Sequence, residues 1–331
     1  MTRPFPTTRN VPIRKDFDAH GAQSSLHLDN GPMTLSFETP AVDQLVELAE
    51  ELAQWQQIPW AGQLHPGDLG WHSSVGADRS AKDQRVWKNG ARPVALGMLD
   101  GPGLIRLAIA PEYVADTSLA EAMAGDLENP SGLFPEDLVN VVEARGATAL
   151  QAELRRRGWA EDEEWTPLVL ELAGEPRWER LEQSGLCIEI VDAEGAAEWT
   201  AVHWSAFKGT PYTDEAREGF VRRWSILMTG PFAGRAQSLI GYDSTGAAVA
   251  VTTVWSAGEG RPGLVEPMGV HRDHQGKGYG VAITQAGVQA LHQAGASAAA
   301  VVAENSNPAA LATYTAAGFT AGASVSDLAR P

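Results

Sequence analysis

The chain has 331 residues, of which 44% are hydrophobic and 20% are charged, a composition typical of a folded globular protein. It carries 25 Lys and Arg residues against 42 Asp and Glu residues, so with a net charge of −17 we expect no nucleic-acid partner and no membrane partner. Cys187 is the only cysteine, which excludes an internal disulfide and a cysteine-ligated zinc site. The N-terminus lacks an apolar signal segment and no run of about 18 apolar residues occurs, so we expect a cytoplasmic protein.

The first predicted elements are an arm, a helix and a loop. Residues 1–33 are polar and rich in Pro, Gly and Asp, and we expect an irregular arm. A helix is predicted in "TPAVDQLVELAEELAQWQ", where apolar residues recur at helical spacing. The loop that follows contains His65, Asp68 and His72, residue types that bind metals. This Pro- and Gly-rich loop has no further residues at the spacing of metal ligands. We therefore expect it to line a cleft between two halves of the chain and not to bind a metal.

The remaining elements occur twice in the same order. Three short apolar runs that indicate strands, "RVW", "RPVALGML" and "GLIRLAIA", precede a helix, a strand and a second helix. The second half repeats this with "SLIGYD", "GAAVAVTTVW" and "PGLVEPMGV", again followed by helix, strand and helix. Ile109 matches Val270, 161 residues later, and the spacing stays within one residue at the following strand and helix end. We infer a tandem duplication, with the join at residues 173–185.

A glycine-rich stretch, "HRDHQGKGYG" at residues 271–280, follows the last of these strands and precedes a helix. The free N–H groups at a helix N-terminus bind anions, and glycines allow a close approach. The stretch lacks the Lys-Ser/Thr of a nucleotide P-loop, and its G-x-G-x-G spacing departs from the dinucleotide fingerprint. Its "HRD" is not followed by the Asn of a kinase catalytic loop.

What matches is Gln275-x-x-Gly278-x-Gly280, which resembles the acyl-CoA pyrophosphate loop of the GNAT superfamily of N-acyltransferases. The preceding "MGV" stands where that family has a strand that splays from its neighbour and admits pantetheine. Further along, "NPAALATYTAAGF" resembles the family's second signature of Asn, Ala, Tyr and Gly-Phe. The resemblance covers roughly residues 185–325. The first half has "VADTSL" in place of the glycine loop and resembles the degenerate half of tandem GNAT proteins of the mycothiol synthase type.

The resemblance implies an α/β (α+β) fold of two tandem GNAT-like domains. Each is expected to be a mixed, mostly antiparallel twisted sheet flanked by helices, with a splayed strand pair in the C-terminal domain. Residues 34–173 would form a degenerate domain without a phosphate loop, and residues 185–331 the catalytic, acyl-CoA-binding domain.

The resemblance also implies roles for individual residues. Loop N–H groups would hold the pyrophosphate, and backbone groups of Met268 and Val270 would pair with pantetheine. A bulge at Gly269 would free the Val270 N–H as the oxyanion donor, and Tyr314 matches the family's general acid. Asn307 is in large part explained as a helix N-cap. The predicted cofactor-binding residues are Met268, Gly269, Val270, Gln275, Gly276, Lys277, Gly278, Tyr279, Gly280 and Asn307.

The general base is less well defined by the sequence. Many relatives have a glutamate where this chain has Leu264. Glu266 lies two residues further on the same face of the strand, so it can serve directly or through water. The alternative is an ordinary carboxylate near a strand end, in which case His203 or bulk solvent would take the proton.

The resemblance implies an acyl-CoA-dependent N-acyltransferase. It would move an acetyl group from acetyl-CoA, without a metal, to a primary amine of a small molecule or peptide by direct attack in a ternary complex. The alternatives are mycothiol synthase-like acetylation of a cysteinyl pseudodisaccharide and a non-catalytic acyl-CoA sensor or interaction protein. We expect a monomer or a homodimer; the sequence leaves the acceptor amine and the acyl chain length open.

Overall fold

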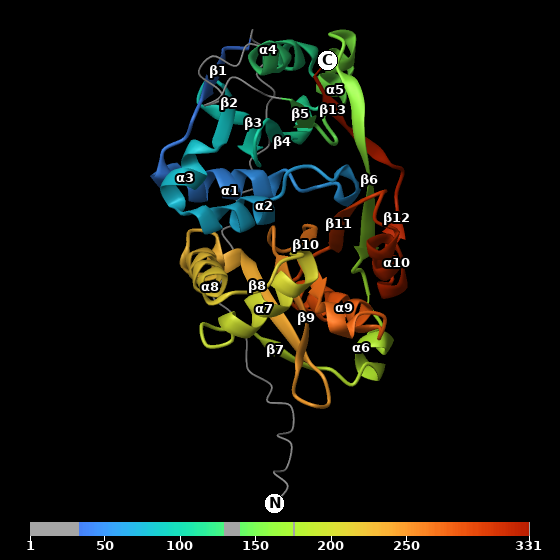
Figure 1. Cartoon of the computed structure of the whole chain (residues 1–331). Coiled ribbons are helices and arrows are strands. Elements are labelled where there is room, and N and C mark those ends of the chain that lie inside the picture. Colours follow the sequence, from blue (N-terminus) through green and yellow to red (C-terminus); the bar gives the residue numbers. More distant parts are fainter. Residues whose placement is uncertain (1–32, 129–139, 175, 331) are drawn as a thin grey trace, which may run out of the picture. The chain divides into compact units, whose positions relative to one another are not determined.

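A computed structural model describes residues 33–128, 140–174 and 176–330, and Figure 1 shows the whole chain. The described residues after Met33 belong to one compact unit. The irregular arm expected for residues 1–33 lies, apart from Met33, outside the described residues. Within the described ranges, no helix combines the length and the apolar character that crossing a membrane requires.

The strands of both halves of the chain join into one mixed sheet. Its order is β1-β2-β3-β4-β5-β13-β6-β11-β10-β9-β8-β7, and β12 pairs with β6 beside this path. The strands are β1 (Leu35–Glu38), β2 (Gln84–Asn89), β3 (Arg92–Leu99), β4 (Leu104–Ile109), β5 (Val141–Glu143), β6 (Ala160–Glu171), β7 (Cys187–Ile190), β8 (Ala236–Tyr242), β9 (Ala248–Trp255), β10 (Gly263–Val270), β11 (Ala298–Glu304), β12 (Thr320–Ala321) and β13 (Val325–Ala329).

Helices separate the strands in a pattern that repeats. The α-helices of the described residues are α1 (Leu45–Gln54), α2 (Pro66–His72), α3 (Ala77–Lys82), α4 (Thr117–Glu128), α5 (Thr148–Arg156), α6 (Glu179–Gln183), α7 (Ala196–Phe207), α8 (Asp214–Thr229), α9 (Tyr279–Gln293) and α10 (Pro308–Ala317). Short 3-10 helices are η1 (Val42–Gln44), η2 (Pro59–Ala61), η3 (Ser73–Val75), η4 (Pro111–Tyr113), η5 (Ala233–Arg235) and η6 (Arg272–His274).

The two halves have the same order of elements, as the repeat in the sequence predicts. In each half three antiparallel strands are followed by a helix, a strand parallel to the third, and a second helix. The strands also follow the same order from the centre of the sheet to each edge, from β5 to β1 on one side and from β11 to β7 on the other. The predicted mixed, mostly antiparallel sheet with flanking helices is therefore confirmed.

The last strand of each half pairs with the other half. β6 follows the first-half helix α5 but pairs with β11, whereas β13, from the end of the second half, lies between β5 and β6. Figure 1 shows β6 running alongside β12 and β13. The join that we infer at residues 173–185 thus divides the chain in sequence, while the sheet is continuous across both halves.

A buried ion pair stabilises this exchange of last strands between the two halves. Arg145, two residues after β5, donates from Nε and Nη2 to the two carboxylate oxygens of Asp327 on β13, both at 3.1 Å. Its Nη1 lies 3.3 Å from Glu143, and its guanidinium carbon lies 4.7 Å from the ring centroid of Trp165 on β6. One side chain therefore connects β5, β6 and β13.

Helix α2 forms a second contact between the halves. A Cβ added to Gly70 would lie 2.2 Å from the ring of Trp255 on β9, and one added to Gly67 would lie 2.6 Å from it. These two glycines therefore allow the first-half helix to lie directly on a second-half strand. The contact brings the loop before α2 to the edge of β10 and β11.

We predict that removing the charge of Asp327 destabilises the fold, because it leaves the buried Arg145 without its bidentate partner. Asp327→Asn should lower the free energy of unfolding in urea by about 3 kcal/mol. The control is Glu161→Gln, which breaks the Arg155–Glu161 pair, whose side chains are 44% and 51% exposed, and should cost less than about 1 kcal/mol. Equal losses in the two variants would contradict the role given to Arg145.

Candidate active site

Strand β10 parts from β11 after two residues. The parallel pairing is limited to Gly263 with Ala299 and Leu264 with Ala300, although β10 continues to Val270. The splayed strand pair that the sequence predicts is thus present. Beyond Leu264, the edge of β10 that faced β11 pairs with no strand among the described residues.

Met268 and Val270 direct their backbone groups toward this gap. On the other edge of β10, the His271 N–H donates to the carbonyl of Val249 at 2.9 Å, and the register pairs Gly269 with Val251. Because alternate residues of an antiparallel strand bond to the same neighbour, Gly269 bonds to β9 and the residues on either side of it face away from β9. The N–H of Val270 is therefore directed away from β9 and toward the gap.

Strand β10 contains a bulge, but the prediction that it lies at Gly269 is wrong. The register shift on β10 lies between Val265 and Met268, so Glu266 and Pro267 together stand opposite Thr253 of β9. Gly269 itself pairs regularly. A Cβ at this position would lie 2.8 Å from Ala206 and 3.0 Å from Phe207, so the glycine allows α7 to pack against β10.

The glycine loop is shaped by backbone conformation. Gly276 and Gly278 have φ angles of +75° and +83°, and a Cβ on either would meet nothing within 4 Å. Gly278 is the N-cap of α9 without a side-chain cap, so the first N–H groups of this helix have no partner within the helix. Gly280 instead allows close packing, because its Cβ would lie 3.1 Å from Thr313 of α10 and 3.5 Å from Val270.

The other predicted loop residues are arranged around this turn. Gln275 and Lys277 are exposed, and Tyr279 is half-buried against the core beneath α9. Asn307 caps α10, because its Oδ1 accepts from the Ala310 N–H at 3.1 Å. The capping role that the sequence assigned to it is confirmed.

Tyr314 lies in the core of the second half with 6% of its surface exposed. Its ring makes an edge contact with Phe319, with 5.7 Å between the ring centroids. Burial, and to a smaller extent the charge of Glu266, raise the pKa of the Tyr314 phenol. The side chain therefore carries its proton at neutral pH and can act as a proton donor.

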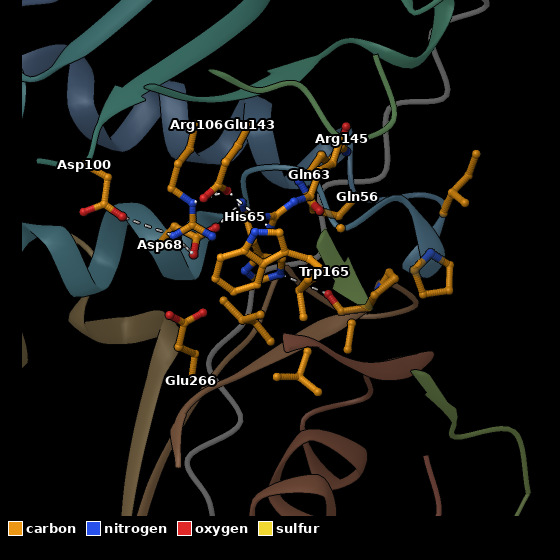
Figure 2. Close-up of a pocket in the computed structure, with 18 of the residues that line it drawn as sticks. Gln56, Gln63, His65, Asp68, Asp100, Arg106, Glu143, Arg145, Trp165 and Glu266 are labelled. Carbon is orange, nitrogen blue, oxygen red and sulfur yellow. Dashed lines mark hydrogen bonds and ion pairs between the residues drawn. The ribbon is translucent and has the colours of Figure 1, made fainter. Parts of the chain in front are cut away.

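A cavity of about 260 Å³ lies between the two halves, and Glu266 is on its second-half wall (Figure 2). Leu264 lines the same cavity, so positions 264 and 266 share one face of β10, as period-two alternation predicts. Burial raises the pKa of Glu266 to about 7, and the charge of Asp68 acts in the same direction. A carboxylate with this pKa is suited to accept and release a proton near neutral pH.

The opposite wall is built by charged residues of the first half. Arg106 on β4 donates from Nε to Glu143 at 2.9 Å, and its Nη1 lies 2.9 Å from Asp68 and 3.5 Å from Asp100. Arg106, Glu143 and Arg145 are not among the site residues predicted from the sequence. The available signal was charge within the apolar runs "GLIRLAIA" and "LVNVVEARG", because a charged side chain on an inward-facing strand position needs a buried partner.

The segment with His65, Asp68 and His72, expected to be a loop, instead contains helix α2, with His65 as its N-cap. His65 and Asp68 line the cavity. His65 accepts from the Gly67 N–H at Nδ1, at 2.9 Å, and its Nε2 lies 3.2 Å from the carbonyl of Pro262 in the other half. His72 turns away and lies 3.0 Å from Asp83. Across the described residues, no cluster of three or more His, Cys, Asp or Glu side chains is arranged to hold a metal.

His203, the second candidate for the base, lies apart from the cavity lining. It stacks on Trp199 at 5.2 Å between ring centroids and also contacts the rings of Trp71, Phe207 and Phe220. Burial lowers the pKa of His203 to about 4. Its surroundings are those of a core side chain, as helical spacing alone would suggest.

Comparison with known proteins agrees with this architecture. Residues 198–319 match the model of the acetyltransferase (GNAT) family. A tandem GNAT protein from the clavulanic acid biosynthesis pathway, solved without AcCoA, superposes with a TM-score of 0.59 at 18% identity, covering 89% of this chain and 98% of that chain. A GNAT-family acetyltransferase from Colwellia psychrerythraea gives 0.55 at 13% identity over 89% and 98%. A GCN5-related N-acetyltransferase from Sphaerobacter thermophilus gives 0.50 at 15% identity over 89% and 95%.

No curated protein matches the sequence. At these identities the solved structures are informative about the fold. Residues 198–319 are thus similar to the acetyltransferase (GNAT) family, and the two halves together share the fold of a solved tandem GNAT protein.

Proposed function

We propose that the protein is an N-acetyltransferase that uses acetyl-CoA and a small primary amine, with its active centre in the second half. The observation that carries the proposal is the arrangement around β10. Its unpaired edge and the glycine loop offer backbone N–H groups, and Glu266 reaches the cavity from the same strand. This arrangement supports binding of an extended acyl-CoA arm as an added strand, with its phosphates at the helix N-terminus.

The proposed reaction needs one proton acceptor and one proton donor. Glu266 accepts the proton of the amine, directly or through water, and the amine nitrogen then attacks the thioester carbonyl carbon. The Val270 N–H stabilises the resulting oxyanion. The C–S bond breaks as the amide forms. The Tyr314 hydroxyl donates its proton to the departing sulfur, and the proton that the new amide nitrogen releases returns to the Tyr314 oxygen, directly or through water.

We propose one acetyl-CoA per chain. In the first half the position of the glycine loop is occupied by Asp116, whose carboxylate accepts from the Leu119 N–H at 2.8 Å and so caps α4. A carboxylate at this helix terminus takes the place that a phosphate would need and repels it. The cavity of about 260 Å³ also favours an acceptor smaller than a cysteinyl pseudodisaccharide.

Replacing Gly278 should weaken acetyl-CoA binding. Gly278→Val forces a β-branched residue into a left-handed conformation and displaces the first N–H groups of α9. We expect a loss on the order of 3–6 kcal/mol in calorimetric titration, from two or three charge-assisted hydrogen bonds. The matched control is Gly246→Val in the β8–β9 turn, where φ is also +83° and space is also open, and which should bind normally. Equal affinities in the two variants would remove the loop from the binding site.

Tyr314→Phe should lower kcat by about 10²–10⁴-fold and leave the Kd of acetyl-CoA nearly unchanged, because only the proton-donating oxygen is lost. Release of CoA thiol gives the rate, and calorimetry gives the affinity. Tyr113→Phe is the control, since Tyr113 packs against the core of the first half and should leave both quantities unchanged. Wild-type turnover in Tyr314→Phe would make Tyr314 a packing residue.

Glu266→Gln should change the pH dependence of the rate. The wild-type rate is expected to rise with pH up to about 7, where Glu266 becomes ionised. The variant depends on free amine, so its rate should keep rising up to the pKa of the amine itself. The ratio of wild-type to variant rate should then be constant below about pH 7 and fall above it. A ratio that is constant at every pH would mean that Glu266 has a structural role.

A further inference from the structure

We infer that the acceptor amine carries a second positively charged group, and that the carboxylates of the first half hold it. This inference rests on the proposed function and names the substrate class of the same site, a short diamine. The cavity is lined by the carboxylates of Asp68, Asp100, Glu143 and Glu266, as Figure 2 shows. Only two guanidinium groups, those of Arg106 and Arg145, are among its lining residues in the described part of the chain.

Both guanidinium groups already have carboxylate partners. Arg106 contacts Asp68 and Glu143, both at 2.9 Å. Arg145 is engaged with Asp327 at 3.1 Å, a further carboxylate just behind the lining, and with Glu143 at 3.3 Å. An anionic group on the acceptor would therefore meet paired cations and several carboxylates. A cationic group would meet carboxylates in excess.

This excess of negative charge is buried and costly without a cation. Asp68 and Glu143 have 3% and 10% of their side-chain surface exposed. Burial raises the pKa of Asp68, although Arg106 opposes the change. A buried carboxylate is stabilised when a cation pairs with it, so a bound ammonium would relieve the repulsion along this wall.

The lining of the cavity suits a short chain with an amine at each end. Glu266 lies on the β10 side, and Asp68 and Asp100 belong to the first half. Ile58, Leu264 and Val302 provide apolar lining for methylene groups. One amine would reach Glu266 and the thioester, and the other would lie against Asp68 and Asp100.

The test compares amines of equal length for release of CoA thiol by the full chain. The series contains 1,4-diaminobutane, butylamine and 4-aminobutyrate. We expect kcat/KM for the diamine to exceed that for butylamine at least tenfold, with 4-aminobutyrate the poorest. Asp100→Asn should reduce the ratio of diamine to butylamine several-fold, because Asp100 is 44% exposed and its removal leaves the 2.9 Å contacts of Arg106 in place. Asp162→Asn, which removes the same charge from an exposed position of β6, should leave the ratio unchanged.

The outcomes separate the two proposals. Equal use of butylamine and diamine, or a preference for 4-aminobutyrate, would overturn the inference while acetyl transfer stands. If no amine releases thiol, calorimetric titration of the two amines decides. Tighter binding of the diamine, lost in Asp100→Asn, would support the cationic site although the proposed reaction had failed. Equal or absent binding would overturn the inference as well.

Discussion

The site depends on one constraint, the parting of β10 from β11 after two paired residues. A strand edge that leaves its neighbour has N–H and C=O groups that need partners, and in the interior of a sheet this is unfavourable. Here the exchange of β6 and β13 between the halves confines the unpaired backbone groups to β10. β6 occupies the far edge of β11 along its whole length, so β11 stays in place while β10 diverges. The gap between β10 and β11 is therefore fixed by the sheet, because β11 pairs with β6 and β10 pairs with β9.

The two halves have the same fold and different chemistry. Arg106 lies on β4 and Glu266 on β10, the third strand of the repeated unit in each half. Both side chains line the same cavity from opposite halves. The helix that follows β10 begins at a glycine with open N–H groups, whereas the helix that follows β4 is capped by Asp116. We propose that the first half lines the acceptor side of the cavity, whereas the second half binds the cofactor.

The sequence predicted those features that local chemistry determines. The glycine loop, the cap at Asn307 and the shared face of Leu264 and Glu266 follow from spacing and residue type alone, and the structure agrees with each. The position of the bulge was missed, because an apolar strand pattern does not show which residue is inserted. Gly269 looked like a bulge, and the structure explains it instead by the contact of α7 with β10.

The charged cavity wall of the first half could not be predicted from the sequence, for a different reason. Arg106, Glu143 and Arg145 belong to the half without a phosphate loop, and they meet Glu266 only through the packing of α2 on β9 and the exchange of β6 and β13. Such long-range pairing leaves no local pattern. Charged residues within apolar strands were the one visible sign, and they do not reveal their partners.

The central claim is that cofactor and acceptor reach one another through the gap beside β10, each held by a different half. The most direct measurement is a crystal structure with acetyl-CoA bound. We expect one molecule per chain, with its pyrophosphate at Gly276 to Gly280, its pantetheine along Met268 and Val270, and its acetyl group directed into the cavity that Glu266 lines. Binding at α4, or an acetyl group directed away from that cavity, would contradict this account.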